Sequence, residues 1–297
     1  MSATQITTLE PGSPEWAKRM SASKIAAVVG HSPYESRFSL WHKMSGNLDW
    51  DEGENADEKK RGHYLEPALR QWFRDQHPDL RVERTGTWER DLFGWQIASP
   101  DALVDDDDLL ECKTSTKDWE WGEPGTDEVP VYYDDQAQWT LLVTGRRRCY
   151  FSVLTSFMEF REYVVDANPQ KQAWLVDEAD TFMRSLGRLT NAPSIDEHDA
   201  TYRAIRKLHP DIEDAEVEID LALAVHYAEA KAAKDDAETA YRGAAAQISL
   251  QLGSARVAKT ATGQTVAYRR AGRGGSTPYL NPARGLTATF LTERHAS

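Results

Sequence analysis

The chain has 297 residues, enough for one large domain or for one domain with an appendage. Its 40% hydrophobic content and ten tryptophans exclude a disordered chain. Two cysteines exclude a disulfide framework and a four-cysteine iron–sulfur site, and they fit a reducing compartment. No apolar run approaches the roughly 18 residues of a membrane span. With no leader-like N-terminus, we expect a cytoplasmic protein that has no membrane partner.

The formal net charge of −13 is unevenly distributed. From residue 253 to the end, seven Lys or Arg stand against one acid, so this part carries +6 and the rest −19. A basic appendage on an acidic body suits either a polyanion or an acidic neighbouring subunit. Charge alone does not choose between them.

The N-terminal part reads as an arm followed by helices. Residues 1–13 are polar and predict a flexible arm. A serine before an apolar run and a glycine after it are helix start and stop signals, and they place a short helix at 21–30. Further helical patterns span 38–44 and 57–77, with a solvated loop at 47–56 between them.

The rest of the core alternates strands and helices. Strand patterns lie near 80–84, 87–88, 149–154 and 159–165. Helical patterns span 131–144 and 169–189. The segment 117–129 is predicted to be a loop. This alternation predicts an α/β or α+β core over residues 14–190, with a mixed central sheet flanked by helices on both sides. A linker at 191–215 then leads to an appendage at 216–297. We expect there one long helix, a basic β-hairpin and a weakly structured tail.

The functional prediction rests on residues 95–114. Two short apolar runs flank four consecutive aspartates, which predicts a β-hairpin with an acidic turn. Side chains alternate along a strand, so Glu111 and Lys113 project to one face, and Asp101 can reach it from the neighbouring strand. Two carboxylates can hold a divalent cation beside an attacking water. The ammonium can orient that water or stabilise developing charge.

An acid two residues before a lysine is a weak signal by itself. Four such pairs occur: Asp57/Lys59, Glu58/Lys60, Glu111/Lys113 and Glu229/Lys231. Only the third follows an apolar strand start and has an aspartate one hairpin upstream. The alternative for this pair is an ordinary surface contact between Glu111 and Lys113 at a strand edge.

Three other polar residues have two interpretations each. Glu66 is either a further metal-associated acid or a solvated glutamate paired with Arg70 one helical turn later. Gln136 is either a satisfied core amide or a contact to a metal-bound water or a nucleotide phosphate. Ser23 caps a helix or, helped by Arg19, binds a phosphate at the helix N-terminus, and these two roles are compatible.

Five segments carry a family resemblance in their order along the chain: Ser21–Tyr34, Arg61–Pro67, Ser99–Ala102, Leu110–Thr114 and Val129–Trp139. Together, over residues 14–187, they resemble the YqaJ-type viral recombinases. These are relatives of the lambda exonuclease and have the PD-(D/E)XK nuclease fold. Five segments in the right order are far more specific than one acid–lysine pair.

The resemblance implies a magnesium-dependent deoxyribonuclease, in which Mn²⁺ can substitute for Mg²⁺. Such an exonuclease degrades the 5′ strand of duplex DNA ends processively, in the 5′→3′ direction. It leaves 3′ single-stranded overhangs for a single-strand annealing protein. The resemblance also implies a phage or prophage protein in a bacterial host, assembled as a homo-oligomeric ring such as a trimer.

The resemblance also assigns roles by segment. The metal would be held by Asp101, Glu111 and the backbone carbonyl of Cys112, with Glu66 as a further candidate ligand. Lys113 would assist the attacking water. The active site would be completed by Glu66 and Gln136. Ser23 with Arg19 resembles the pocket for the 5′ phosphate of the recessed strand. The spacing between them is shorter than in lambda exonuclease, and Arg37 is an alternative cation. The resemblance gives no role to the last 100 or so residues.

Two other functions remain open. One is a non-catalytic DNA-end-binding or assembly protein on the same fold, against which the intact acid–acid–lysine set argues. The other is a related endonuclease, or a nuclease acting on RNA.

Overall fold

The computed structural model describes residues 3–6, 9, 13–50 and 56–292. The chain divides into two compact units, Met1–Ile212 and Glu213–Ser297. Part of the expected loop at 47–56, residues 51–55, lies outside the described residues. No described helix is both long and apolar enough to cross a bilayer.

A five-stranded sheet is the centre of the first unit. Its strands, in spatial order, are β3 (Val82–Glu83), β6 (Ala102–Val104), β7 (Asp108–Thr114), β8 (Arg148–Leu154) and β9 (Phe160–Asp166). Strands β7 and β8 pair in parallel along their whole length, and the other neighbours pair antiparallel. The sheet is therefore mixed, as predicted.

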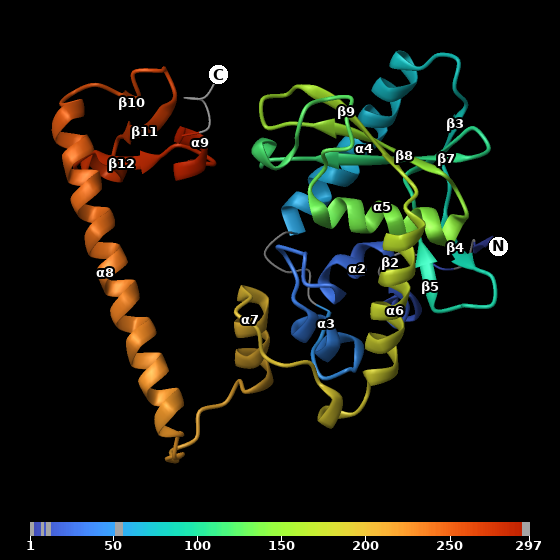
Figure 1. Cartoon of the computed structure of the whole chain (residues 1–297), viewed down its shortest axis with the longest axis horizontal. Coiled ribbons are helices and arrows are strands. Elements are labelled where there is room, and N and C mark those ends of the chain that lie inside the picture. Colours follow the sequence, from blue (N-terminus) through green and yellow to red (C-terminus); the bar gives the residue numbers. More distant parts are fainter. Residues whose placement is uncertain (1–2, 7–8, 10–12, 51–55, 293–297) are drawn as a thin grey trace. The chain divides into compact units, whose positions relative to one another are not determined.

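Helices cover both faces of this sheet (Figure 1). Leu110 packs with Phe73 of α4 (Ala56–Gln76), whereas Leu109 packs with Leu141 of α5 (Val131–Thr144). Consecutive residues of β7 thus serve opposite layers, because side chains alternate along a strand. By the same alternation, Glu111 lies on the α5 face.

A second sheet has four strands in the order β1 (Ala3–Ile6), β4 (Thr87–Arg90), β5 (Gln96–Ala98) and β2 (Met20–Ser21). A core around Trp41, Trp139 and Phe182 joins its strands to the helices α2 (Ala22–Val28), α3 (Arg37–Met44) and α6 (Pro169–Ser185). A short helix, α1 (Pro14–Ala17), precedes β2.

Two expectations are corrected by this second sheet. Residues 3–6, expected in a flexible arm, form a strand antiparallel to β4, where they supply partners for backbone groups that an open sheet edge would leave unpaired. Residues 96–98, expected in the hairpin, belong to this sheet instead. The chain changes sheet at Ser99-Pro100, where the proline has no N–H to continue a ladder.

The predicted linker is not wholly extended. It contains a short helix, α7 (Asp199–Leu208), which contacts α3. Thr201 at the start of α7 donates a hydrogen bond of 2.7 Å to the hydroxyl of Ser36, at the N-cap of α3. Short 3-10 turns lie at Asp118–Glu120 and Leu189–Asn191.

The second unit begins with α8 (Leu221–Leu252), none of whose side chains is buried. Gly253, with a φ of 54°, ends it. A three-stranded antiparallel sheet follows: β10 (Val257–Lys259), β11 (Thr265–Arg270) and β12 (Tyr279–Pro282). A 3-10 turn at Arg273–Gly275 and the helix α9 (Ala288–Thr292) complete the unit. The basic hairpin is thus present, but β12 and α9 lie in the tail that was expected to be weakly structured.

Candidate active site

The hairpin of β6 and β7 positions the predicted acids. Its register aligns Ala102 with Leu110, so Asp101, one residue before β6, lies beside Glu111. The aspartates of the turn have a different role: Asp106 and Asp107 form exposed ion pairs of 2.5 Å with Arg81 and Arg147. These ion pairs offset the negative charge of the turn, which lies at the opposite end of the hairpin from Glu111.

Asp101 is partly buried next to Glu111. Its Oδ2 accepts a hydrogen bond of 2.7 Å from the backbone N–H of Cys112. Burial, and after it the negative charge of Glu111, raise the pKa of Asp101 to about 7, although Lys113 and the Cys112 N–H act in the opposite direction. The two carboxylates are therefore close enough to repel each other, as the predicted metal site requires.

Glu111 and Lys113 form an ion pair of 2.8 Å, with side chains 3% and 14% exposed. This burial rules out the surface contact considered from the sequence. Burial alone lowers the pKa of Lys113, but Glu111 and Asp101 outweigh it and hold that pKa above the ordinary value. The second oxygen of Glu111, Oε1, is buried and has no hydrogen-bond partner among the described residues.

Gln136 joins the two ends of this ion pair. Its Nε2 donates to Glu111 Oε2 at 3.1 Å, and its Oε1 accepts from Lys113 Nζ at 3.3 Å. Lys113 Nζ also lies 5.1 Å from the ring centroid of Tyr133, one turn earlier on α5. Gln136 is thus a satisfied amide whose partners are the predicted catalytic residues. The contribution of Tyr133 was missed; its only sequence signal is the i, i+3 spacing from Gln136.

Glu66 pairs with Arg70 at 2.7 Å, as its simpler interpretation predicted. The pair is not solvated, however, because Arg70 is buried and also donates to the backbone carbonyl of Asp101 at 3.3 Å. The charge of Glu66 contributes to the raised pKa of Asp101. Glu66 therefore lies at the edge of the site and is linked to it through Arg70.

Within the described residues, no three His, Cys, Asp or Glu side chains form a ready-made metal site. Arg70 and Lys113 occupy oxygens of Glu66 and Glu111 that could serve as ligands. The unpartnered Oε1 of Glu111 and the crowding that raises the pKa of Asp101 nevertheless fit a hard divalent cation, which carboxylate oxygens prefer to bind.

The three residues predicted to bind a 5′ phosphate each contact another side chain. Ser23 lies in the first turn of α2 and its hydroxyl is 3.1 Å from that of Ser21, the N-cap residue. Arg19 pairs with Glu89, and Arg37 pairs with Glu178 at 2.8 Å. In the described part of the chain, no hydrogen bond joins Ser23 to either arginine.

Lys24, which the sequence did not single out, ties the two parts of this region together. Its buried ammonium donates to the carbonyls of Trp16, Ala17 and Arg19 at 3.1, 2.8 and 2.7 Å. Burial lowers its pKa to about 7. Lys24 thus fastens the segment that carries Arg19 onto the helix that carries Ser23.

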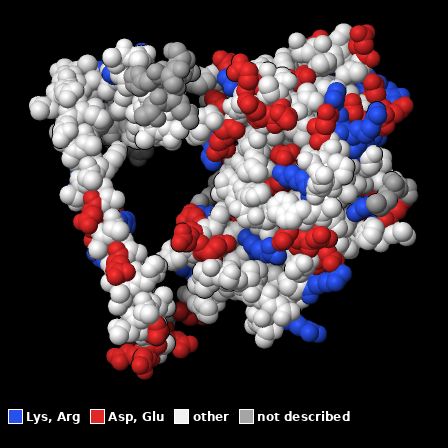
Figure 2. Space-filling model, in the orientation of Figure 1, with Lys and Arg blue, Asp and Glu red and all other residues white. Residues whose placement is uncertain are grey.

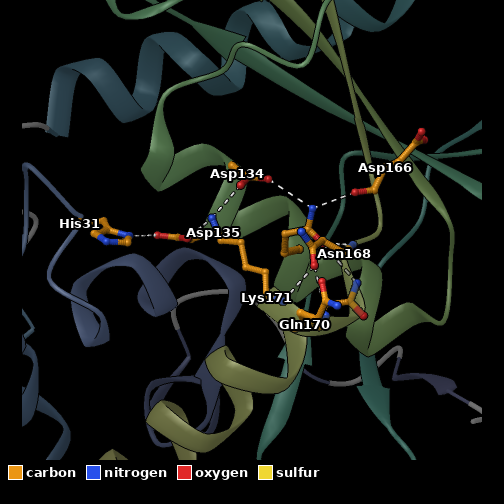
Figure 3. A network of polar contacts seen from close by, with 9 residues as sticks. His31, Asp134, Asp135, Asp166, Asn168, Gln170 and Lys171 are labelled. Atoms are coloured by element: carbon orange, nitrogen blue, oxygen red, sulfur yellow. Dashed lines mark hydrogen bonds and ion pairs between the residues drawn. The ribbon is translucent and has the colours of Figure 1, made fainter.

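An ion network centred on the buried Asp135 holds the start of α5 (Figure 3). Asp135, the residue before Gln136, lies 2.6 Å from Lys171 Nζ of α6 and 2.7 Å from His31 Nδ1 of the loop after α2. The same Lys171 contacts Asp134 at 2.6 Å. The network therefore fixes the helical turn that presents Gln136 to Lys113.

Residues 16–147 match the family model of the YqaJ-like viral recombinase domain. The match includes all the predicted site residues, from Arg19 to Gln136. The mixed sheet with helices on both faces confirms the predicted α/β fold class, and Asp101, Glu111 and Lys113 lie on its hairpin as predicted.

Several solved structures are similar to this chain. The alkaline exonuclease from Laribacter hongkongensis is 21% identical, with a TM-score of 0.46 over 58% of this chain and 91% of that one. Its complex with dAMP gives 21% identity and a TM-score of 0.47 over 57% and 88%. A phage-related exonuclease from Haemophilus somnus 129PT is 12% identical, with a TM-score of 0.43 over 56% and 93%. No curated protein matches the sequence.

Proposed function

We propose that this protein is a metal-dependent exonuclease that hydrolyses phosphodiester bonds at the ends of duplex DNA. The observation that carries the proposal is the buried, unpartnered Oε1 of Glu111 beside Asp101, with Lys113 2.8 Å from the other oxygen of Glu111. The YqaJ-like domain supports a nuclease of the phage type, and nucleases of this family generally depend on a divalent metal.

The residues have distinct roles in this proposal. Asp101, Glu111 and the carbonyl of Cys112 would hold Mg²⁺, for which Mn²⁺ can substitute. When bound, the cation lowers the pKa of water and offsets charge on the phosphate. Lys113 orients the attacking water through its N–H groups. Gln136 keeps the ammonium of Lys113 directed at the site, and Glu66 acts on Asp101 through Arg70.

The finer features rest on the family resemblance. We propose 5′→3′ polarity, 3′ overhangs that pass to a single-strand annealing protein, and a homo-oligomeric ring as the working assembly. Ser23 with Arg19, or with Arg37, would hold the 5′ phosphate of the recessed strand. In the cell, the protein would act in the cytoplasm of a bacterium that carries the phage or prophage.

Digestion of linear duplex DNA labelled at either the 5′ or the 3′ end tests the proposal. With Mg²⁺ we expect loss of the 5′-labelled strand, no cleavage in chelator, and no cleavage of covalently closed duplex. Cleavage of closed duplex would instead indicate an endonuclease. Binding of DNA ends without digestion under any divalent cation would indicate the non-catalytic alternative.

A further inference from the structure

The C-terminal unit has a sheet whose sequence is basic and free of acids. Residues 253–292 contain six Lys or Arg and no Asp or Glu, in a chain that has 48 acids. The helix before them differs, because Figure 2 shows acidic side chains along α8. The positive charge is therefore concentrated on β10, β11, β12 and their connections.

The strand register gathers one arginine and two tyrosines on one face of this sheet. Tyr268 and Arg270 are two residues apart on β11 and so project to the same side. The Arg270 guanidinium lies 5.9 Å from the ring centroid of Tyr268. On β12, Tyr279 is the direct cross-strand partner of Arg270. Arg270 is exposed and Tyr279 is 53% exposed, so this face offers a cation between two aromatic rings.

The opposite face has a structural role. Arg269 projects there, next to Leu280 of β12, and its guanidinium donates to the backbone carbonyl of Gly253 at the end of α8. Ala267, on the same side, is buried. The two neighbouring arginines of β11 therefore differ: Arg269 ties the sheet to the helix, whereas Arg270 is exposed beside Tyr268 and Tyr279.

This chemistry favours a nucleic acid over an acidic protein surface. Cations alone would suit either, because both are polyanionic. Exposed aromatic rings beside a cation can stack on bases, and one stacked base contributes about 1–3 kcal/mol. Stacking requires bases that are not paired in a duplex, so the arrangement fits a single strand.

We propose that the face formed by Tyr268, Arg270 and Tyr279 binds single-stranded DNA. Arg270 contacts the phosphate backbone, and the two tyrosines stack on neighbouring bases. The preference for DNA over RNA rests on the proposed function, because an exonuclease that removes one strand leaves the other single-stranded. Binding of a single strand at this face does not depend on the metal site.

Fluorescence anisotropy of the full-length protein with labelled oligothymidylate, in chelator and at low salt, tests the proposal. We expect Arg270→Gln combined with Tyr279→Ala to raise the Kd for the single strand at least tenfold. We also expect the slope of log K against log salt to become shallower by about 0.7 for the lost phosphate contact. The control Arg242→Gln, on α8, removes the same charge and should leave Kd unchanged.

Two single substitutions of Tyr279 control for misfolding of the double variant. Tyr279→Leu keeps an apolar side chain and should weaken binding, whereas Tyr279→Trp should restore it; circular dichroism should be unchanged in both. An unchanged Kd in all the sheet variants overturns the proposal. So does an equal loss on a blunt duplex, which indicates charge alone, or a loss confined to oligouridylate.

The binding test of the sheet can be distinguished from the digestion test of the proposed nuclease, because the binding assay involves no cleavage. Glu111→Gln should bind oligothymidylate like the wild type. If the wild-type protein fails to digest DNA but the sheet variants lose binding, only the nuclease proposal falls.

Discussion

Lys113 Nζ lies 2.8 Å from Glu111 Oε2, and both side chains arise from the same face of β7. An ion pair this deeply buried gains little net stability, because desolvation of both charges offsets their attraction. Glu111 also keeps one oxygen without a partner. The buried pair therefore contributes little to stability, which agrees with the catalytic role that we propose for it.

Lys113→Met and Glu111→Gln should each lower the rate of DNA digestion by about 10²–10⁴, because each removes a charge that orients water or stabilises the developing anion. Rates on end-labelled duplex at saturating Mg²⁺ measure this. The control is one of the three other acid–lysine pairs at this spacing, Glu229 and Lys231 on α8, where Lys231→Met should leave the rate unchanged. Wild-type rates for Lys113→Met would exclude the assignment.

Asp101 gives a prediction on pH. Its folded-state pKa is raised from 3.8 to about 7. The folded protein thus binds an extra proton between these values, and stability is lost as pH rises through 7. Over roughly three pKa units, the loss is on the order of 4 kcal/mol. In chelator, the unfolding free energy of the wild type should therefore fall between about pH 5 and pH 8 relative to that of Asp101→Asn.

Ca²⁺ provides the check on this interpretation. At about pH 8, adding it should raise the Tm of the wild type, since a ligand that binds the folded state stabilises it. It should not raise the Tm of Asp101→Asn. Parallel pH curves for the two proteins in chelator would show that Asp101 titrates in its ordinary range.

The sequence predicted those parts of the site that depend on local periodicity. Alternation along β7 sufficed to place Glu111 and Lys113 on one face, and helix α5 was predicted over its full length, Val131–Thr144. What it could not give were pairings between distant segments. Nothing in residues 3–6 indicates β4 as their partner, and the bond from Arg70 to the carbonyl of Asp101 follows from packing of α4 on the sheet.

To bind a 5′ phosphate, Arg19 would have to separate from Glu89, or Arg37 from Glu178. If Arg19 completes the pocket, Arg19→Ala and Ser23→Ala should each reduce the preference for 5′-phosphorylated over dephosphorylated ends about tenfold, as expected for loss of a charge-assisted hydrogen bond. Arg37→Ala should then leave the preference intact. Initial rates on the two kinds of end measure the ratio. If only Arg37→Ala abolishes the preference for 5′-phosphorylated ends, Arg37 and not Arg19 completes the pocket. Equal rates of the wild-type protein on the two kinds of end would exclude a phosphate pocket.

Asp134 and Asp135 offer a matched comparison, because both lie 2.6 Å from Lys171 Nζ but their side chains are 28% and 0% exposed. Asp135→Asn should destabilise the protein by about 3–5 kcal/mol, since it leaves Lys171 without its buried counter-charge and weakens the contact to His31. Asp134→Asn should cost about 1 kcal/mol or less. Urea unfolding measures both values, and equal costs would show that burial does not decide the energetics of this network.

Because Gln136 follows Asp135 directly, Asp135→Asn should also slow digestion in the folded protein, while Asp134→Asn should not.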